Sequence, residues 1–155
     1  MTSKLLHDHG GQRTFALVFE TGEEVMSGLI EFARNHRLKA SHFTAIGAFS
    51  DAVVAYFDWE TKTYKPIPIR EQVEVLTLAG DIAWRDRAPQ VHAHVVLGRS
   101  DATARGGHLM EAHVRPTLEV ILIESPKHLE RQMDPESGLP LIDLSVPEGS
   151  VGWKA

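Results

Sequence analysis

The N-terminal part of the chain predicts one strand followed by one amphipathic helix. Residues 13–20 are rich in β-forming side chains and end at the turn signal Thr21-Gly22. Apolar side chains then recur at the spacing of one helix face, at Val25, Met26, Leu29, Ile30, Phe32 and Ala33. Thr21 and Glu24 have the spacing of a capping box, in which side chains satisfy the first free amides of a helix. These features predict a helix that runs to about Asn35.

Beyond this helix, apolar and β-branched runs alternate with Gly, Pro and Asp and predict successive strands. The expected strands are 41–47, 50–58, 64–68, 72–84, 90–97, 107–114 and 117–124. Ser125-Pro126 predicts the start of a short second helix, because proline is favourable at the first helical position. One strand, one helix and then a run of strands is the pattern of an α+β domain with a mostly antiparallel sheet.

Length and composition fit a single cytoplasmic domain. A chain of 155 residues leaves little room for two domains, so we expect one domain over 13–144 between a flexible N-terminus (1–12) and a loose tail (145–155). The absence of cysteine excludes disulfides, thiolate catalysis and cysteine-rich zinc modules. No apolar run approaches about 18 residues, and the polar N-terminus lacks the apolar segment of a signal peptide. We therefore expect a cytoplasmic protein with no membrane partner.

The charge balance does not favour nucleic acid as a partner. The chain has 16 Lys and Arg against 21 Asp and Glu, a formal net charge of −5. Domains that grip DNA phosphates unaided are usually basic, because each phosphate contact needs a Lys or Arg. The two short basic clusters, at 34–39 and 85–87, fit solvated helix ends or loops. No glycine-rich loop followed by a helix supports nucleotide binding.

Histidine is unusually frequent, with nine copies, and three of them predict a metal site. Side chains alternate along a strand, so His92 and His94 share one face. In an antiparallel hairpin the residue numbers of paired positions add up to a constant. If His94 pairs with His108, the centre of the turn falls at Asp101, where the turn-forming residues lie. His108 would then face His94 across the ladder. Three imidazoles leave an ion one open coordination position, which is typical of catalytic zinc.

Two alternatives to this site remain open at the level of sequence. Strand histidines are often only surface residues, and a bulge at Gly106-Gly107 would shift the register and turn His108 away. His113 has the opposite parity to His108 in a regular strand, so we interpret it as a supporting or core histidine.

Glu119 is a carboxylate within an otherwise apolar strand. If buried, it must be paired, hydrogen-bonded or neutral. Near a metal it would act as a general base or as a partner that orients an imidazole ligand. The alternative is a carboxylate at an interface or an edge strand. Asp81 and Arg99 are weaker candidates for the same site.

Several segments together resemble a known family. The most specific are His92-Ala93-His94, Gly106-Gly107-His108-Leu109 and Pro116-Thr117-Leu118-Glu119-Val120. Others are Gly22-Glu23, Ala45–Asp51, Glu74–Gly80, Leu129–Arg131 and Asp134–Leu139. Through these segments residues 13–144 resemble the PPC domain, which is conserved in plants and prokaryotes and catalogued as a domain of unknown function, in its stand-alone bacterial type.

The resemblance implies an α+β fold around an antiparallel sheet, similar to that of acetolactate decarboxylase, and a homotrimer. It also implies a divalent metal, usually zinc, on His92, His94 and His108. Members of the family are commonly labelled DNA-binding proteins, and plant members carry an AT-hook with the motif Arg-Gly-Arg-Pro. This sequence contains no such motif.

Three functions are compatible with these features. The first is a trimeric metal-binding protein that acts in regulation, through protein partners or DNA. The second is a zinc-dependent enzyme, a lyase or hydrolase acting on a small carbonyl or carboxylate substrate, with Glu119 as proton shuttle. The third is a trimer whose ion only stabilises the fold. An open coordination position and Glu119 favour the second over the third, and the negative charge counts against DNA binding in the first.

Overall fold

The computed structural model of the chain describes residues 1–146, which form one helix and nine strands. In chain order these are β1 (Thr2–His9), β2 (Gln12–Glu20), α1 (Val25–Asn35), β3 (Ala40–Asp58), β4 (Thr63–Ile69), β5 (Val73–Arg85), β6 (Ala88–Gly98), β7 (Ala104–Glu124), β8 (Glu130–Met133) and β9 (Pro140–Asp143). The expectation of a mostly β fold with one main helix is confirmed. Among the described residues, no helix is both long and apolar enough to cross a membrane.

The two longest strands, β3 and β7, organise the sheet. The strand order is β1-β2-β7-β3-β5-β8-β9, with β4 paired to β3 and β6 paired to both β5 and β7. The named strands pair antiparallel, except that β8 meets β5 in parallel at Trp84 and Glu130. Because β6 joins β5 to β7 and both of these also pair with β3, these four strands form a closed circuit.

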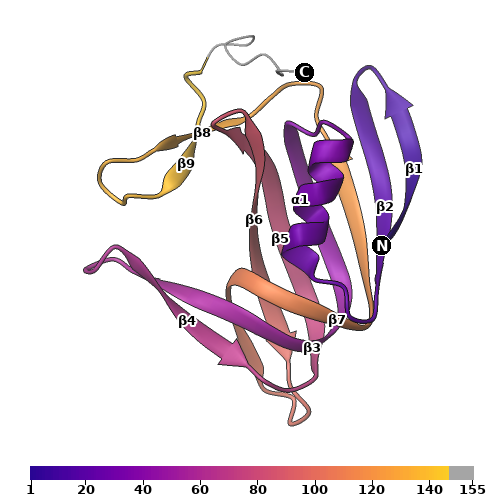
Figure 1. Cartoon of the computed structure of the whole chain (residues 1–155), viewed down its shortest axis with the longest axis vertical. Coiled ribbons are helices and arrows are strands. Elements are labelled where there is room, and N and C mark those ends of the chain that lie inside the picture. The colour runs from indigo at the N-terminus through magenta and orange to yellow at the C-terminus, as the bar shows by residue number, and fades with distance from the viewer. Residues whose placement is uncertain (147–155) are drawn as a thin grey trace.

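Helix α1 lies across one face of the sheet and forms the core with it (Figure 1). Its buried residues are Val25, Leu29, Phe32 and Ala33. They join one cluster with alternate residues of the strands, such as Phe15, Leu17 and Phe19 of β2 and Leu118, Val120 and Leu122 of β7. The intervening strand residues therefore point to the opposite face of the sheet.

The N-terminus is a strand where the sequence analysis predicts a flexible segment. Gly10 and Gly11 have φ values of 59° and 80°, the two positive angles that a tight two-residue hairpin turn needs. The turn folds β1 back on β2 in an antiparallel ladder. Every residue of β1 is exposed, so the sequence of this segment has no clear apolar alternation to indicate a strand. Only the hydrogen-bonded ladder to β2 makes this segment a strand.

The helix start and the segment after β7 also differ from the prediction. Glu24 is the N-cap residue, because its carboxylate accepts hydrogen bonds from the amides of Met26 and Ser27. No second helix forms at Ser125-Pro126. The amide of Ser125 instead donates to the carbonyl oxygen of Ala40, at the start of β3. Of the predicted tail, residues 147–155 lie outside the described part of the chain.

Candidate metal centre

The β6–β7 hairpin has the register that the sequence predicts. His94 pairs with His108, and the ladder continues outward to Gly98 and Ala104. Asp101 lies in the turn, where its carboxylate accepts hydrogen bonds from the amide and the hydroxyl of Thr103. No bulge at the two glycines displaces His108 from this ladder. Strand pairing therefore brings all three candidate histidines to one place.

The three imidazoles converge closely enough to share one ion. One nitrogen from each of His92, His94 and His108 lies within 4.8 Å of the other two. The ring centroids are 5.1 Å apart for His92 with either partner and 5.4 Å apart for His94 with His108. Val91, Ala93 and Val95, the strand neighbours of His92 and His94, are buried in the core, which fixes the backbone from which these two imidazoles project.

The electrostatics of His94 and His108 favour neutral imidazoles, the form that binds metals. Burial, together with the nearby His92, His94 and Arg131, lowers the pKa of His108 to about 4. Burial and His92 also lower the pKa of His94. Nδ1 of His108 is buried without a hydrogen-bond partner. An imidazole that stays neutral at neutral pH and lies near two other imidazoles fits a metal ligand.

Asp81 and Tyr64 support the triad from neighbouring strands. Asp81 pairs with His92 in the β5–β6 ladder, and its Oδ2 lies 3.5 Å from Nδ1 of His92. Its other carboxylate oxygen accepts a hydrogen bond from Arg131. The ring of Tyr64, on β4, lies 4.6 Å from the ring of His108. Carboxylates that hold the second nitrogen of a metal-binding histidine are a common feature of such sites.

Gly107 lets β7 lie close to β3 beside the triad. A Cβ at Gly107 would lie 2.7 Å from the carbonyl oxygen of Ala55, and Ala55 is the β3 partner of His108. Gly106 has a similar constraint, with the carbonyl oxygen of Val95 at 2.5 Å from a Cβ. The glycine pair is therefore a device for close strand contact rather than the source of a register shift.

A cavity of about 260 Å³ opens beside two of the three histidines. His92 and His108 form one wall, and the β8–β9 hairpin contributes Arg131 and residues 139–141 to the other. An ion on the triad would thus have room for a further ligand. Sequence reasoning does not find Tyr64 or Arg131 as site residues, because neither belongs to the histidine pattern and both reach the cavity through tertiary packing.

Glu119 and Arg99 lie elsewhere. Glu119 is exposed at the far end of β7, between Val18 of β2 and Ile46 of β3. The structure does not bring its carboxylate to the triad of the same chain, which corrects the expectation of a base or an orienting partner there. Arg99 pairs with Glu71 at 2.7 Å, beside the β6–β7 turn.

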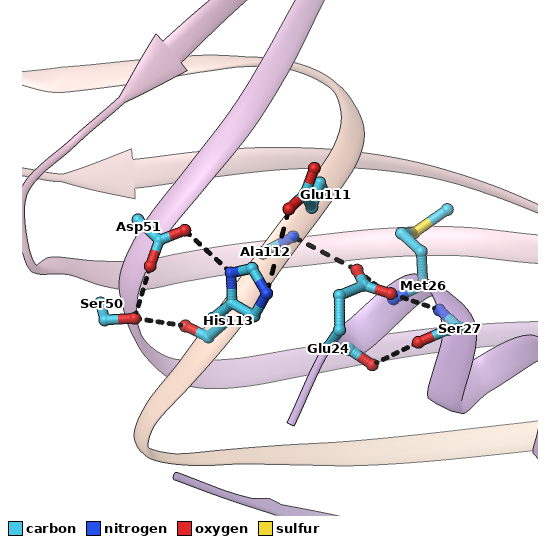
Figure 2. A network of polar contacts seen from close by, with 8 residues as sticks. All are labelled: Glu24, Met26, Ser27, Ser50, Asp51, Glu111, Ala112 and His113. Atoms are coloured by element: carbon cyan, nitrogen blue, oxygen red, sulfur yellow. Dashed lines mark hydrogen bonds and ion pairs between the residues drawn. The ribbon is translucent and has the colours of Figure 1, made fainter. Parts of the chain in front are cut away.

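His113 belongs to a separate polar cluster beside the start of α1 (Figure 2). Its Nδ1 lies 2.9 Å from Asp51 Oδ1, and the other oxygen of Asp51 accepts from the hydroxyl of Ser50. The contacts of that hydroxyl are to Asp51 and to the carbonyl oxygen of His113, not to the imidazole, so the geometry is not that of an activated nucleophile. His113 thus neither supports the triad nor lies in the core; it ties β7 to β3.

The chain matches a family model and has relatives of known structure. The model of the Plants and Prokaryotes Conserved (PCC) domain matches residues 7–126. A metal-containing protein from Archaeoglobus fulgidus is 35% identical with a TM-score of 0.78, covering 83% of this chain and 91% of that one. A protein from Ralstonia eutropha, provisionally described as DNA-binding, is 29% identical with a TM-score of 0.79, covering 84% of this chain and 90% of that one. No curated protein matches significantly.

A more distant likeness concerns the fold alone. A protein of unknown function from Staphylococcus aureus, similar to alpha-acetolactate decarboxylase, is 13% identical with a TM-score of 0.51, covering 70% of this chain and 50% of that one. The fold expected from the sequence resemblance agrees with this likeness. Because the family model matches most of the chain and the Archaeoglobus relative is 35% identical over most of both chains, this chain belongs to the PCC domain family, the PPC domain of the sequence resemblance.

Proposed function

We propose that the chain is a regulatory protein that binds one divalent ion, zinc, through His92, His94 and His108, and a small ligand beside it. The observation that carries this proposal is the convergence of three imidazoles, from two adjacent strands, at the wall of a cavity. Zinc suits a site of imidazoles without thiolates. The metal-containing Archaeoglobus relative supports a metal on this fold.

Metal analysis of purified protein tests the proposal directly. We expect about one zinc per chain in the parent and almost none in His94→Ala, because two imidazoles hold zinc far more weakly than three. His9→Ala is the matched control, since His9 is an exposed histidine on β1 outside the triad. Full metal occupancy in His94→Ala would contradict the proposed ligand set.

The composition of the cavity wall favours ligand binding over catalysis. Bound zinc would supply a Lewis acid that polarises a ligand oxygen. Among the described residues that line the cavity, none is Asp or Glu, so no carboxylate base faces that space. A zinc-dependent lyase or hydrolase for a small carbonyl or carboxylate substrate is the second candidate. The room for a substrate beside the triad favours it, and Glu119 is not its base within one chain.

We also propose a homotrimer, and the sheet face opposite α1 supports it. Exposed apolar side chains follow one another across five neighbouring strands, at Val18, Ile121, Ile46, Leu76 and Val96. Ile46 and Leu76 are 61% and 55% exposed in the single chain. The exposed Glu119 lies between Val18 and Ile46 on this face, and exposed apolar side chains grouped around a polar residue are typical of an interface. Light scattering should give a trimer mass for the parent and a smaller species for Ile46→Asp; a monomeric parent at micromolar concentration would contradict this.

A further inference from the structure

His94 and Glu119 lie on the same face of the sheet. The strand neighbours of His94 on β6 are buried in the core, so His94 itself points to the face opposite α1. The strand neighbours of Glu119 on β7 are buried in the core as well, so its carboxylate points to that same face. This is the face proposed above as the trimer interface, and His94 is the exposed member of the triad.

Within one chain, Glu119 is too far from the triad to bind the same ion. Two strands, β3 and β5, lie between β6, which carries His94, and the C-terminal half of β7, which carries Glu119. Three strand spacings amount to roughly 14 Å, which is beyond the reach of a glutamate side chain. A contact between this carboxylate and the triad therefore needs a second copy of the chain.

An interface on this face leaves Glu119 in need of a partner. Glu119 lies between Val18 and Ile46, so a surface that covers these two side chains also removes its carboxylate from water. A buried carboxylate must be paired with a cation or satisfied by hydrogen bonds. The neighbouring positions of the face carry no cation; they are Ala16, Val18, Thr44, Ile46, Thr117 and Ile121.

The triad has the opposite requirement. Three neutral imidazoles give a divalent ion no negative ligand, and zinc sites often combine histidine nitrogens with a carboxylate oxygen. His92 and His108 border the cavity described above, whereas His94 borders a second hollow of about 280 Å³. The other residues of this hollow are Thr77, Ala79, Val95, Val96, Gly106 and Gly107. A side chain of another copy thus has room beside His94, and the cavity stays available to a small ligand.

A closed ring of three copies can bring the two groups together. In a ring, each interface joins one part of the surface of a copy to a different part of the next copy. Glu119 lies toward the β2 side of the face and His94 toward the β6 side, so neighbouring copies can meet with these two sides in contact. We infer that in the trimer Glu119 of the partner subunit is the fourth zinc ligand at each triad. This inference deepens the proposed function and rests on it, because it needs both the ion and the trimer.

The zinc affinity of variants that remove one carboxylate tests the inference. Competition of the full chain with a chromophoric chelator should find zinc affinity about 100-fold lower in Glu119→Gln. A direct ligand should contribute at least as much as residues that orient ligands, which are worth about 10- to 100-fold. Light scattering of the same samples should find Glu119→Gln still trimeric, which separates a lost ligand from lost assembly.

Glu74→Gln is the matched control for Glu119→Gln. Glu74 is also exposed and lines the same surface hollow as Glu119, but it pairs with the buried Ala48 and with Gly98 rather than with exposed apolar residues. We expect its zinc affinity to equal that of the parent. Unchanged affinity in Glu119→Gln, or an equal loss in Glu74→Gln, overturns the inference, while zinc bound to these proteins leaves the three-histidine site intact.

Mixed trimers test whether the carboxylate comes from the neighbouring copy. His94→Ala and Glu119→Gln should each bind zinc weakly when purified alone. When the two chains are co-expressed, the complete triad of a Glu119→Gln chain can lie against the intact Glu119 of a His94→Ala chain, so tight zinc binding should return. A carboxylate that acts within its own chain cannot restore the site in this way. Mixed trimers without tight zinc binding would therefore overturn the inference.

A monomeric variant keeps the test decisive if Glu119→Gln fails to fold. Ile46→Asp, expected above to dissociate the trimer, retains Glu119 and all three histidines, and it should bind zinc about as weakly as Glu119→Gln. Zinc affinity equal to that of the parent in monomeric Ile46→Asp overturns the inference and leaves the three-histidine site. A parent protein without zinc, or one that is monomeric, overturns the proposed function on which the inference rests.

Discussion

Replacing Asp81 by asparagine tests whether a carboxylate beside the triad orients a metal ligand. Asp81 Oδ2 lies 3.5 Å from Nδ1 of His92, and its other oxygen accepts from Arg131. Burial acts to raise the pKa of Asp81, but the contacts with His92 and Arg131 outweigh it and hold the pKa below its ordinary value. The ionised carboxylate therefore favours a proton on Nδ1 of His92 and leaves Nε2 free for an ion.

The expected loss follows from what asparagine keeps and what it removes. Asp81→Asn retains an oxygen that can accept from Arg131, so the buried guanidinium keeps a partner. It removes the negative charge that holds His92. Removing such a partner typically costs 10- to 100-fold in metal affinity, or about 1.4 to 2.7 kcal/mol. Because the Asp81 side chain is 27% exposed, solvent screens the interaction, and we expect a loss of about tenfold.

Competition with a chromophoric zinc chelator at pH 7.5 measures the affinity. The chain offers a matched control, Asp51→Asn, which removes the carboxylate beside a histidine outside the triad, His113. We expect zinc affinity to fall in Asp81→Asn and to stay unchanged in Asp51→Asn. Unchanged affinity in Asp81→Asn, or an equal loss in both variants, would refute the idea that Asp81 acts by orienting His92.

Three further predictions concern other parts of the molecule. The hydrogen bond to Asp51 raises the pKa of His113, so its stabilising effect is present below the ordinary value of 6.5 and disappears as the pH rises through the raised pKa. NMR titration should therefore find a lower His113 pKa in Asp51→Asn. Urea unfolding should find that Asp51→Asn loses more unfolding free energy at pH 5 than at pH 9. Equal losses of unfolding free energy at the two pH values would be inconsistent with a stabilising His113–Asp51 pair. Gly107→Ala places a Cβ 2.7 Å from the carbonyl oxygen of Ala55 and should destabilise the fold by about 1–3 kcal/mol. Thermal unfolding measures this loss, and a variant as stable as the parent would argue against the close approach of β7 to β3. Three copies of a chain with net charge −5 carry about −15, so mobility-shift titration at physiological salt should detect no duplex DNA binding tighter than about 10 μM; salt-sensitive sub-micromolar binding would show otherwise.

The histidine triad could be predicted because it depends on local geometry. Alternation of side chains is a property of any extended strand, so it places His92 and His94 on one face without reference to the rest of the fold. A short turn around Asp101 then sets the register that brings His108 opposite His94. The amphipathic helix was predictable for a similar reason, since its apolar spacing lies within a single element.

Positions that depend on contacts between distant segments were not predictable. Regular alternation predicts that His113 faces the side opposite to His108, but Met110 is an extra residue in the ladder between β7 and β3, which reverses the parity beyond it. For Glu119 the sequence leaves two roles open, at the metal or as an interface or edge-strand carboxylate, and only the structure shows that its apolar neighbours face the core under α1 while its own side chain faces outward.

The sequence by itself determined the helix, the strand-rich fold and the convergence of the three histidines, because short-range periodicity and one turn specify them. Only the tertiary structure decided what surrounds the triad. Asp81, Tyr64 and Arg131 come from three different strands, and the sheet register and the β8–β9 hairpin bring them to the triad. Their positions depend on how strands far apart in the sequence pair and pack, and local sequence patterns do not predict those long-range contacts.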